Sequence, residues 1–246
     1  KMKRPENIAR LENVEQINSS NIHYLTYLTF HKELFAAIQK FAKGRLLDIG
    51  CGNKPYENWC KDFVNEYVGC DVVQSSANKV DVLSPANQIP LDSNTFDTVL
   101  ITQVIEHVED HQGMLNEAYR LLKPNGYIIV SGPMYWYLHE EPYDFFRFTK
   151  HGFKYILEKS GFEVMEINEN GGAWATLGLM INHTFNFNNP EANKVAKRIK
   201  YIFKKLKLHK TVNKVFSYLD RKDYNTINTI NYVVIARKKE SMHPIL

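Results

Sequence analysis

The chain has 246 residues, of which 44% are hydrophobic, and a formal net charge of +4. It is long enough to bury one large core, and α/β domains of this length commonly fold as a single unit. It has no apolar run long enough to span a membrane, and its first residues, KMKRPENIAR, lack the hydrophobic segment of a signal peptide. The 3 cysteines have neither metal-ligand spacing nor the even count of a disulfide framework. We therefore expect a cytoplasmic protein and predict no metal site.

The positive charge is concentrated in one segment, whose basic residues are Lys194, Lys197, Arg198, Lys200, Lys204, Lys205, Lys207 and Lys210. Residues 191–210 have a net charge of +7 against +4 for the whole chain, so the remaining residues sum to −3. One basic segment on a mildly acidic body argues against a general nucleic-acid-binding surface. We therefore expect no nucleic-acid partner.

Helical and strand patterns alternate along the chain. Residues 22–44 carry apolar side chains at helical spacing and predict a helix that ends at Gly44. Further helices are predicted over 114–122 and over 149–161, with Thr149 as the N-cap of the second. Short runs rich in β-branched residues predict seven strands, at 45–49, 66–73, 79–83, 96–103, 127–132, 163–168 and 230–237. This alternation is typical of an α/β fold with a doubly wound, mostly parallel sheet.

The region between the last two predicted strands, residues 171–228, interrupts this alternation. It contains an apolar stripe opposite the lysines, which a second helix continues, and so predicts a helical hairpin inserted before the last strand. The stripe consists of Ala192, Val195, Ile199, Ile202, Phe203 and Leu206, then Val212, Val215, Phe216 and Leu219. Such a basic amphipathic helix can lie on an anionic membrane, bind an acidic partner, or pack its stripe on the body with the lysines in water. We favour packing on the body over membrane contact.

The stretch RLLDIGCGNKPY, residues 45–56, predicts a buried strand that runs into a glycine turn. Gly50 and Gly52 let the backbone bend tightly and approach a ligand closely. A dinucleotide-binding turn would place a third glycine where this chain has Pro55, and the G-K-[ST] ending of a triphosphate loop is missing. The turn therefore favours a nucleoside-like ligand without a phosphate chain.

Three aspartates lie near this turn in the predicted fold. Asp71 ends the second strand, where a carboxylate can accept hydrogen bonds from both hydroxyls of a ribose. Asp81 can accept from an exocyclic amine such as that of adenine, or be an ordinary turn aspartate. Asp48, on the first strand, either orders the glycine loop or meets an ammonium group, because an unpaired buried carboxylate is costly.

Four segments in this order and spacing resemble the class I S-adenosylmethionine-dependent methyltransferases, in particular the type 11 small-molecule group: LLDIGCGNKPY, YVGCDVV, IPLDSNTFDTVLITQVIEHVED and LLKPNGYIIVSGP. The resemblance covers residues 40–168 and returns at NYVVIARK. It implies a Rossmann-like sheet of seven strands in which the seventh is inserted antiparallel between the fifth and sixth. It also implies S-adenosyl-L-methionine as cofactor.

The resemblance further assigns the cofactor-binding residues. Asp48, Gly50 and Gly52 would line the methionine end, Asp71 would hold the ribose and Asp81 would meet adenine. By the same resemblance Gln103 faces the cofactor and the acceptor. The chain departs from the family pattern D-x-G-x-G-x-G at the last glycine, which is Lys54. We expect the Lys54 side chain to point to solvent.

The resemblance divides the chain into three parts. Residues 1–43 would form an N-terminal helical cover. Residues 44–170 and 229–240 would form the S-adenosylmethionine-binding domain, and 171–228 the helical insertion. Tyr24, Tyr27 and Trp136 are candidates to cover the cofactor, although core packing is the commoner use of such aromatics.

The long loop after the fifth strand, residues 131–148, is predicted to form the acceptor site, because ligands of open α/β sheets bind beyond the carboxyl ends of the strands. Its sequence HEEPYDFFRFT supplies the predicted catalytic residues His139, Glu141 and Arg147, with Glu140 and Asp144 as further candidates. An ion-paired structural loop is the alternative. Family likeness makes Glu106 and His107 structural rather than catalytic.

The sequence thus predicts a methyltransferase that acts on a small-molecule or sugar-like acceptor, at oxygen. An NAD(P)-dependent Rossmann oxidoreductase would share the aspartate after the second strand, but the missing third glycine and the segment FDTVLITQVIEHVED count against it. A base-flipping amino-methylase would show an N-P-P-Y-type stretch where this chain has TQVIEH. A non-catalytic S-adenosylmethionine-binding protein remains an alternative.

Overall fold

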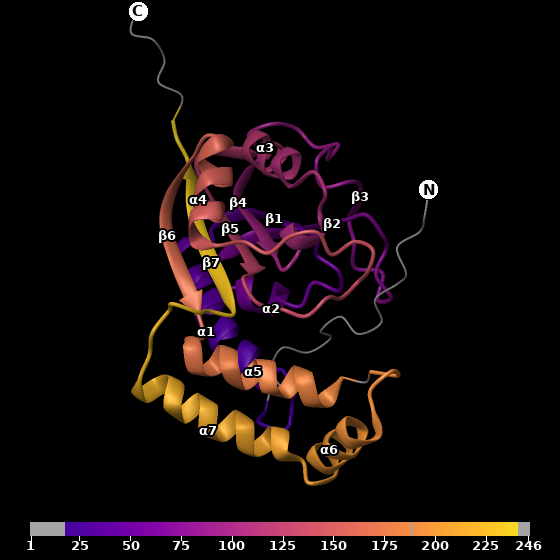
Figure 1. The fold of residues 1–246 in the computed structure, drawn as a ribbon. Coiled ribbons are helices and arrows are strands. Elements are labelled where there is room, and N and C mark those ends of the chain that lie inside the picture. The colour runs from indigo at the N-terminus through magenta and orange to yellow at the C-terminus, as the bar shows by residue number, and fades with distance from the viewer. Residues whose placement is uncertain (1–17, 188, 241–246) are drawn as a thin grey trace, which may run out of the picture.

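The computed structural model describes residues 18–187 and 189–240, so the N-terminal stretch KMKRPENIAR lies outside the described residues. At its centre is a seven-stranded sheet in the order β3-β2-β1-β4-β5-β7-β6 (Figure 1). Strand β7 pairs antiparallel with both β5 and β6, and the other pairs are parallel. The predicted sheet, including its inserted last strand, is confirmed. The strands are β1 (Gly44–Ile49), β2 (Val64–Asp71), β3 (Val82–Leu83), β4 (Phe96–Thr102), β5 (Leu122–Pro133), β6 (Phe162–Asn170) and β7 (Asn231–Lys238).

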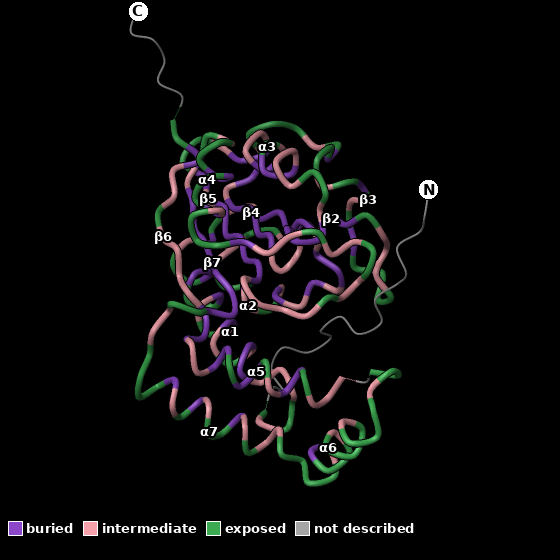
Figure 2. The backbone as a smooth tube through the Cα atoms, viewed as in Figure 1, coloured by how far each residue is buried: buried purple, intermediate pink, exposed green. Residues whose placement is uncertain are grey.

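Helices cover both faces of the sheet. They are α1 (Tyr24–Phe41), α2 (Glu57–Cys60), the 3₁₀ turn η2 (Ile105–His107), α3 (His111–Leu121), α4 (Lys150–Lys159), α5 (Ala173–Asn186), α6 (Lys194–Lys205) and α7 (Leu208–Lys222). Leu46 and Leu100 pack with α1 on one face, whereas Leu47 and Val99 pack with α3 and α4 on the other. Figure 2 shows the central strands as buried. Burial on both faces explains why these strands read as continuous apolar runs.

Helix α4 begins where the sequence predicts. The Thr149 hydroxyl accepts a hydrogen bond from the Gly152 backbone N–H, at 3.1 Å. Asp110 and Asn193 cap α3 and α6 in the same way, at 2.9 Å each. These caps fix the helix starts by giving partners to N–H groups that have none within the helix.

The insertion contains the predicted helical hairpin, formed by α6 and α7, and one further helix, α5, which was not predicted. Helix α5 packs between α1 and α7, and Figure 1 shows α5, α6 and α7 together on one side of the sheet domain. A Cβ added at Gly178 would lie 2.6 Å from the Phe216 Cβ, so the glycine is what lets α5 and α7 approach. The Asp220 carboxylate accepts from the backbone N–H groups of Gly172 and Ala175, at 3.1 and 3.0 Å, and caps α5 from α7.

The prediction that the apolar stripe packs on the body is wrong for most of α6. Phe203 is buried and stacks on Phe185 at 4.8 Å between ring centroids, but the rest of the stripe along this helix faces solvent. The exposed members are Val195 (68%), Ile199 (49%), Ile202 (43%) and Leu206 (62%). Helix α6 therefore contacts the protein with one edge of its stripe and leaves the remainder uncovered.

Candidate active site

A cavity of about 1380 Å³ lies at the carboxyl ends of β1, β2 and β4. The glycine turn and the end of β2 form one side, and segment 84–87 lies beside them. Residues of η2, of the loop after β5 and of α1 form the other side. The cavity is thus where ligands of open α/β sheets bind.

The glycine turn is tightly constrained. Gly50 and Gly52 both have left-handed backbones, with φ of 77° and 50°. The Gly50 N–H donates to the Cys70 carbonyl at 2.8 Å, and a Cβ at Gly50 would lie 2.3 Å from Val104 Cγ2. A side chain at Gly50 is therefore excluded both by conformation and by space.

Lys54, which stands at the family's last glycine, also has a left-handed backbone, with φ of 54°. The expectation that its side chain points to solvent is wrong: Lys54 is buried, and its Nζ lies 2.6 Å from Asp81 Oδ2. Asp81 also accepts from the Gly69 N–H at 2.6 Å. Burial by itself would raise the pKa of the Asp81 carboxyl, but these two donors outweigh that effect and hold the pKa below its usual value.

This ion pair changes the role expected of Asp81. The described residues that line the cavity do not include Asp81, and near β3 they are Ser84, Pro85 and Ala86. Asp81 is therefore a partner of Lys54 beneath the turn, and the structure does not place it at an adenine site. The sequence predicts Asp81 at the end of a third strand over 79–83, whereas in the structure Asp81 directly precedes β3, and its carboxylate pairs with Lys54.

Asp71 lines the cavity beside the turn, as predicted. Its Oδ2 accepts from the Gly52 N–H at 3.1 Å, and its Oδ1 accepts from the Val73 N–H at 3.3 Å. Asp71 is 5% exposed. These two backbone contacts tie the glycine turn to the end of β2 and fix the carboxylate at the cavity edge.

Asp48 lies beneath the turn rather than on the cavity lining, which begins at Ile49. Its Oδ2 accepts from the Tyr67 hydroxyl at 2.6 Å, whereas its Oδ1 has no hydrogen-bond partner among the described residues. Burial raises the pKa of the Asp48 carboxyl to about 7. A cationic ligand group near the turn would compensate for this buried, half-partnered carboxylate.

Gln103 directly follows β4 and lines the cavity. Its backbone is left-handed, with φ of 53°, and its Nε2 donates to the Ser131 hydroxyl of β5 at 3.1 Å. The Gln103 N–H donates to the Ser131 carbonyl at 3.2 Å. This strained corner holds the end of β4 against β5.

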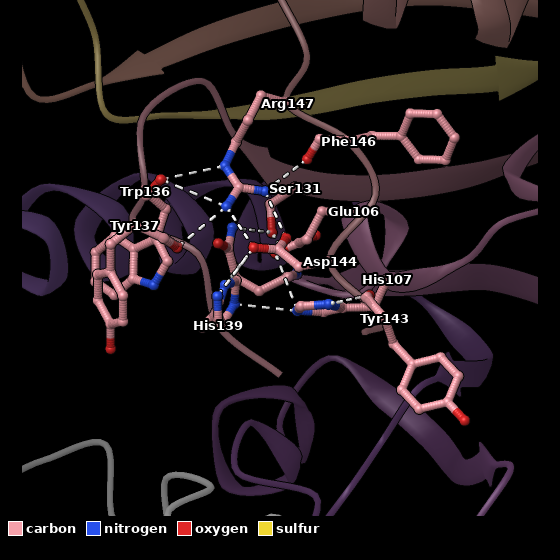
Figure 3. Close-up of polar contacts among 11 residues, drawn as sticks. Glu106, His107, Ser131, Trp136, Tyr137, His139, Tyr143, Asp144, Phe146 and Arg147 are labelled. Carbon is pink, nitrogen blue, oxygen red and sulfur yellow. Dashed lines mark hydrogen bonds and ion pairs between the residues drawn. The ribbon is translucent and has the colours of Figure 1, made fainter. Parts of the chain in front are cut away.

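The loop after β5 is held in shape by Arg147 (Figure 3). Its guanidinium makes two contacts with Asp144, Nη1 to Oδ1 at 2.6 Å and Nη2 to Oδ2 at 2.8 Å, and it donates to the carbonyls of Tyr137 and Phe146. Against the effect of burial, these contacts hold the pKa of Asp144 at about 2. Arg147 therefore clamps the loop, which agrees with the ion-paired alternative for this residue.

The structure does not bring the three predicted catalytic residues together. Among the described residues, His139 lines the cavity but Glu141 and Arg147 do not, and Glu141 is exposed. The sequence could not show which of these residues reach the cavity, because all three lie within one loop whose path depends on the contacts of Arg147.

Glu106 and His107, expected to be structural, line the cavity next to His139. His139 Nδ1 lies 3.2 Å from Asp144 Oδ2, and its Nε2 lies 3.1 Å from His107 Nε2. His107 Nδ1 contacts the Tyr143 carbonyl at 2.8 Å. Glu106 is 1% exposed, and burial raises its carboxyl pKa to about 8. Figure 3 shows this polar group gathered around Asp144 and His139.

Aromatic rings close another part of the cavity. The His23 ring lies 5.0 Å from that of Trp136, and Tyr137 lies 4.7 Å from His183 of α5. Burial lowers the pKa of His23 to about 4 and of His183 to about 3, so both rings are neutral at pH 7. Tyr27 and Trp136 line the cavity as predicted, whereas Tyr24 packs in the core between α1 and α5. Neither His23 nor the support from α5 was predicted.

Residues 47–130 match the model of a protein family described as a methyltransferase domain, type 11. The chain therefore contains a methyltransferase domain of the class I S-adenosylmethionine-dependent type. A relative named as a probable S-adenosylmethionine-dependent methyltransferase supports S-adenosyl-L-methionine as the cofactor, and the family match decides against the nicotinamide-dependent oxidoreductase. The glycine turn, Asp71 beside it and the half-partnered Asp48 carboxylate fit such a nucleoside-like, cationic group.

Similar proteins support this family. A probable S-adenosylmethionine-dependent methyltransferase of Mycolicibacterium smegmatis is 27% identical over 112 residues, which cover 42% of this chain and 44% of that protein. A ubiquinone biosynthesis O-methyltransferase of Bartonella tribocorum is 25% identical over 133 residues, 48% of this chain and 53% of that protein. These matches span about half the length of the relatives.

Solved structures share the fold. A methyltransferase from Archaeoglobus fulgidus superposes with a TM-score of 0.53 at 19% identity, covering 87% of this chain and 94% of that chain. The YcgJ protein of Bacillus subtilis gives 0.51 at 14% identity, with 86% and 100% covered. None of the helices in the described part of the chain is both long enough and apolar enough to cross a membrane.

Proposed function

We propose that this methyltransferase transfers the methyl group of S-adenosyl-L-methionine to a hydroxyl oxygen of a small-molecule or sugar-like acceptor. The observation that carries the proposal is a single cavity with the glycine turn and Asp71 on one side and the His139–Asp144 pair on the other. Its volume of about 1380 Å³ exceeds the range of roughly 300–1,000 Å³ typical of sites for one small ligand, so it has room for two. Relatives named as ubiquinone biosynthesis O-methyltransferases support oxygen as the acceptor atom.

The cofactor would be held at the turn. The Asp71 carboxylate would accept from the ribose hydroxyls, Gly50 and Gly52 would let the backbone approach the ligand, and the Asp48 carboxylate would attract the ammonium group. Gln103 would lie between cofactor and acceptor. When bound, S-adenosyl-L-methionine supplies an electrophilic methyl group on a sulfonium sulfur.

The protein's own contribution is positioning and activation of the acceptor. Trp136 and Tyr137 would exclude water from the reacting groups, and well-aligned reactants gain roughly 7–11 kcal/mol from their alignment. His139 would activate the acceptor hydroxyl. Its Nδ1–H donates to the Asp144 carboxylate, so a neutral His139 ring directs the lone pair of Nε2 away from Asp144. Arg147 is a positioning residue, because it acts through Asp144.

The test compares His139→Ala with His151→Ala, an exposed histidine on α4. We expect His139→Ala to lose about 10²- to 10⁴-fold in methyl transfer to a panel of hydroxyl acceptors, while S-adenosylhomocysteine binds as to wild type in calorimetry. His151→Ala should retain both properties. Full transfer by His139→Ala would remove this residue from the mechanism, and tight cofactor binding without transfer to any acceptor would favour the non-catalytic alternative.

A further inference from the structure

Three potential metal ligands meet on the acceptor side of the cavity. Glu106 and His107 come from η2 after β4, and His139 comes from the loop after β5. One carboxylate oxygen and one nitrogen of each ring all lie within 4.8 Å of one another. All three residues line the cavity, so a ligand bound there is accessible from it.

The two histidines are oriented so that their Nε2 atoms face each other. A carbonyl oxygen only accepts hydrogen bonds, so the contact of His107 Nδ1 with the Tyr143 carbonyl requires a proton on Nδ1. The contact of His139 Nδ1 with the Asp144 carboxylate requires the same. In neutral rings both Nε2 atoms then carry lone pairs, although they lie only 3.1 Å apart. A cation bound beside both atoms would accept both lone pairs.

The hydrogen bonds behind the rings are those of metal-binding histidines. Such histidines usually donate the remote N–H to a carboxylate or a backbone carbonyl, which fixes the tautomer and makes the ligating nitrogen more basic. Here His139 has the carboxylate of Asp144 and His107 has the carbonyl of Tyr143.

Glu106 provides an independent sign of a missing partner. Its side chain is 1% exposed, and its Oε2 has no hydrogen-bond partner among the described residues. Its Oε1 lies 3.9 Å from His107 Nε2. A buried carboxylate is costly unless it is paired or binds a metal, and a divalent cation beside the two Nε2 atoms would provide its charge partner.

We propose that Glu106, His107 and His139 bind one divalent transition-metal ion, with coordination positions left open to the cavity. Two imidazoles and one carboxylate suit Zn²⁺, Fe²⁺ or Co²⁺. In a tetrahedral zinc site with Zn–N bonds of about 2.1 Å, two ligand nitrogens lie about 3.4 Å apart, close to the 3.1 Å between the two Nε2 atoms.

The bound ion would activate the acceptor hydroxyl, with His139 acting as one of its ligands. This role of the ion in methyl transfer rests on the proposed function, whereas the metal site itself does not. A hydroxyl that occupies an open coordination position loses its proton more readily, because the cation stabilises the oxyanion. His139 would then act as a ligand, and its loss would remove metal and transfer activity together.

The test is binding of Zn²⁺ to the full chain after treatment with a chelator, measured by calorimetry, with visible absorption of Co²⁺ as a second readout. We expect one ion per chain, at least about 10-fold weaker binding by His139→Ala, and unchanged binding by His151→Ala. His139 is the first choice because it is partly exposed, whereas His107 is buried. Circular dichroism confirms that each variant folds.

The outcomes separate this inference from the proposed function. No ion bound by wild type, or equal binding by wild type and His139→Ala, overturns the metal site and leaves a shared proton between the histidines. Metal binding without methyl transfer supports the metal site and counts against the proposed function. Transfer that survives complete removal of metal supports the function and overturns the role of the ion.

A second inference rests on helix α6, independently of the cavity. Val195, Ile199, Ile202 and Leu206 recur at spacings of four, three and four residues, so they form one stripe, and each is between 43% and 68% exposed. Basic side chains that are also exposed flank the stripe: Lys194, Lys197, Arg198 and Lys205. The helix therefore presents apolar and cationic groups to solvent side by side.

We propose that α6 docks on an anionic lipid surface. Its apolar stripe would enter the boundary between headgroups and acyl chains, while the basic residues would contact acidic headgroups. The net charge of +7 in residues 191–210 provides the charge complementarity. Helix α6 also adjoins the cavity wall, because Lys200 Nζ donates to the Phe187 carbonyl at 2.9 Å and the Phe187 ring lies 4.3 Å from that of Tyr137.

The test is sedimentation of the full chain with phosphatidylcholine vesicles that contain or lack phosphatidylglycerol. We expect binding to the anionic vesicles alone, reduced by salt and by at least about 10-fold in the double variant Ile199→Asn/Leu206→Asn. Ile227→Asn, at a residue 84% exposed outside α6, is the matched control and should bind as wild type. The proposal is overturned if wild type does not bind the anionic vesicles, or if wild type and the double variant bind them equally. It is also overturned if light scattering shows a dimer for wild type but not for the double variant, because the stripe would then bind a second copy of the chain.

Discussion

Asp71→Ala is the sharpest test of how the chain holds its cofactor. The Asp71 carboxylate already accepts from the N–H groups of Gly52 and Val73, one on each oxygen. An ionised carboxylate has about four acceptor sites in all. In the proposed function this carboxylate also accepts from the two hydroxyls of the ribose.

The magnitude follows from these two bonds. A hydrogen bond to a charged group contributes roughly 1.5–3 kcal/mol, and water replaces part of what the substitution removes. We therefore expect S-adenosylhomocysteine to bind Asp71→Ala about 2–4 kcal/mol more weakly, equivalent to about a 30- to 900-fold higher Kd. Asp71→Asn, which keeps one oxygen but loses the charge, should fall between this variant and wild type.

Calorimetry with S-adenosylhomocysteine measures both Kd values. Asp62→Ala is the matched control, because Asp62 is exposed and lies just before β2. Thermal unfolding monitors the cost of freeing the Gly52 N–H. A Kd for Asp71→Ala within about twofold of wild type, in a folded variant, would show that the ribose is held elsewhere.

Three further predictions concern the elements that shape the site. Lys54→Ala and Lys54→Gly both lose the ion pair with Asp81, but only glycine adopts the φ of 54° without strain. We therefore expect Lys54→Gly to be about 1 kcal/mol more stable than Lys54→Ala in urea unfolding. Equal stabilities would show that the turn is unstrained. Arg147→Met leaves the buried Asp144 carboxylate without its clamp and should cost about 3 kcal/mol. Faster amide exchange over 136–147 with little change in S-adenosylhomocysteine affinity would support the clamp, and unchanged exchange would contradict it. Gly178→Ala would place a Cβ 2.6 Å from the Cβ of Phe216 and should lower the free energy of unfolding by about 1–3 kcal/mol. Leu177→Ala, at a residue that is 45% exposed, should lower it less. The reverse order of the two variants in thermal unfolding would refute the close packing of α5 on α7.

The sequence by itself determined the features that depend on neighbours along the chain. Short runs of β-branched and other apolar residues located the strands. These runs are continuous because the strands are buried on both faces of the sheet. Gly50 and Gly52 marked the turn because few other residues tolerate its backbone, and Thr149 marked a helix start through a contact three residues away. Asp71 was found because the end of β2 adjoins the end of β1 in any sheet of this order.

Only the tertiary structure decided which polar groups meet. His107 and His139 are 32 residues apart in sequence, and their contact depends on the path of a loop that Arg147 holds in place. Lys54 turned inward because Asp81 lay within its reach, which no local pattern reports. Periodicity showed that α6 has an apolar stripe, but whether other helices cover a stripe is set by how remote segments pack, and here they leave it exposed. Local patterns reflect short-range conformational preferences, whereas contacts between distant segments exist only once the whole chain has folded.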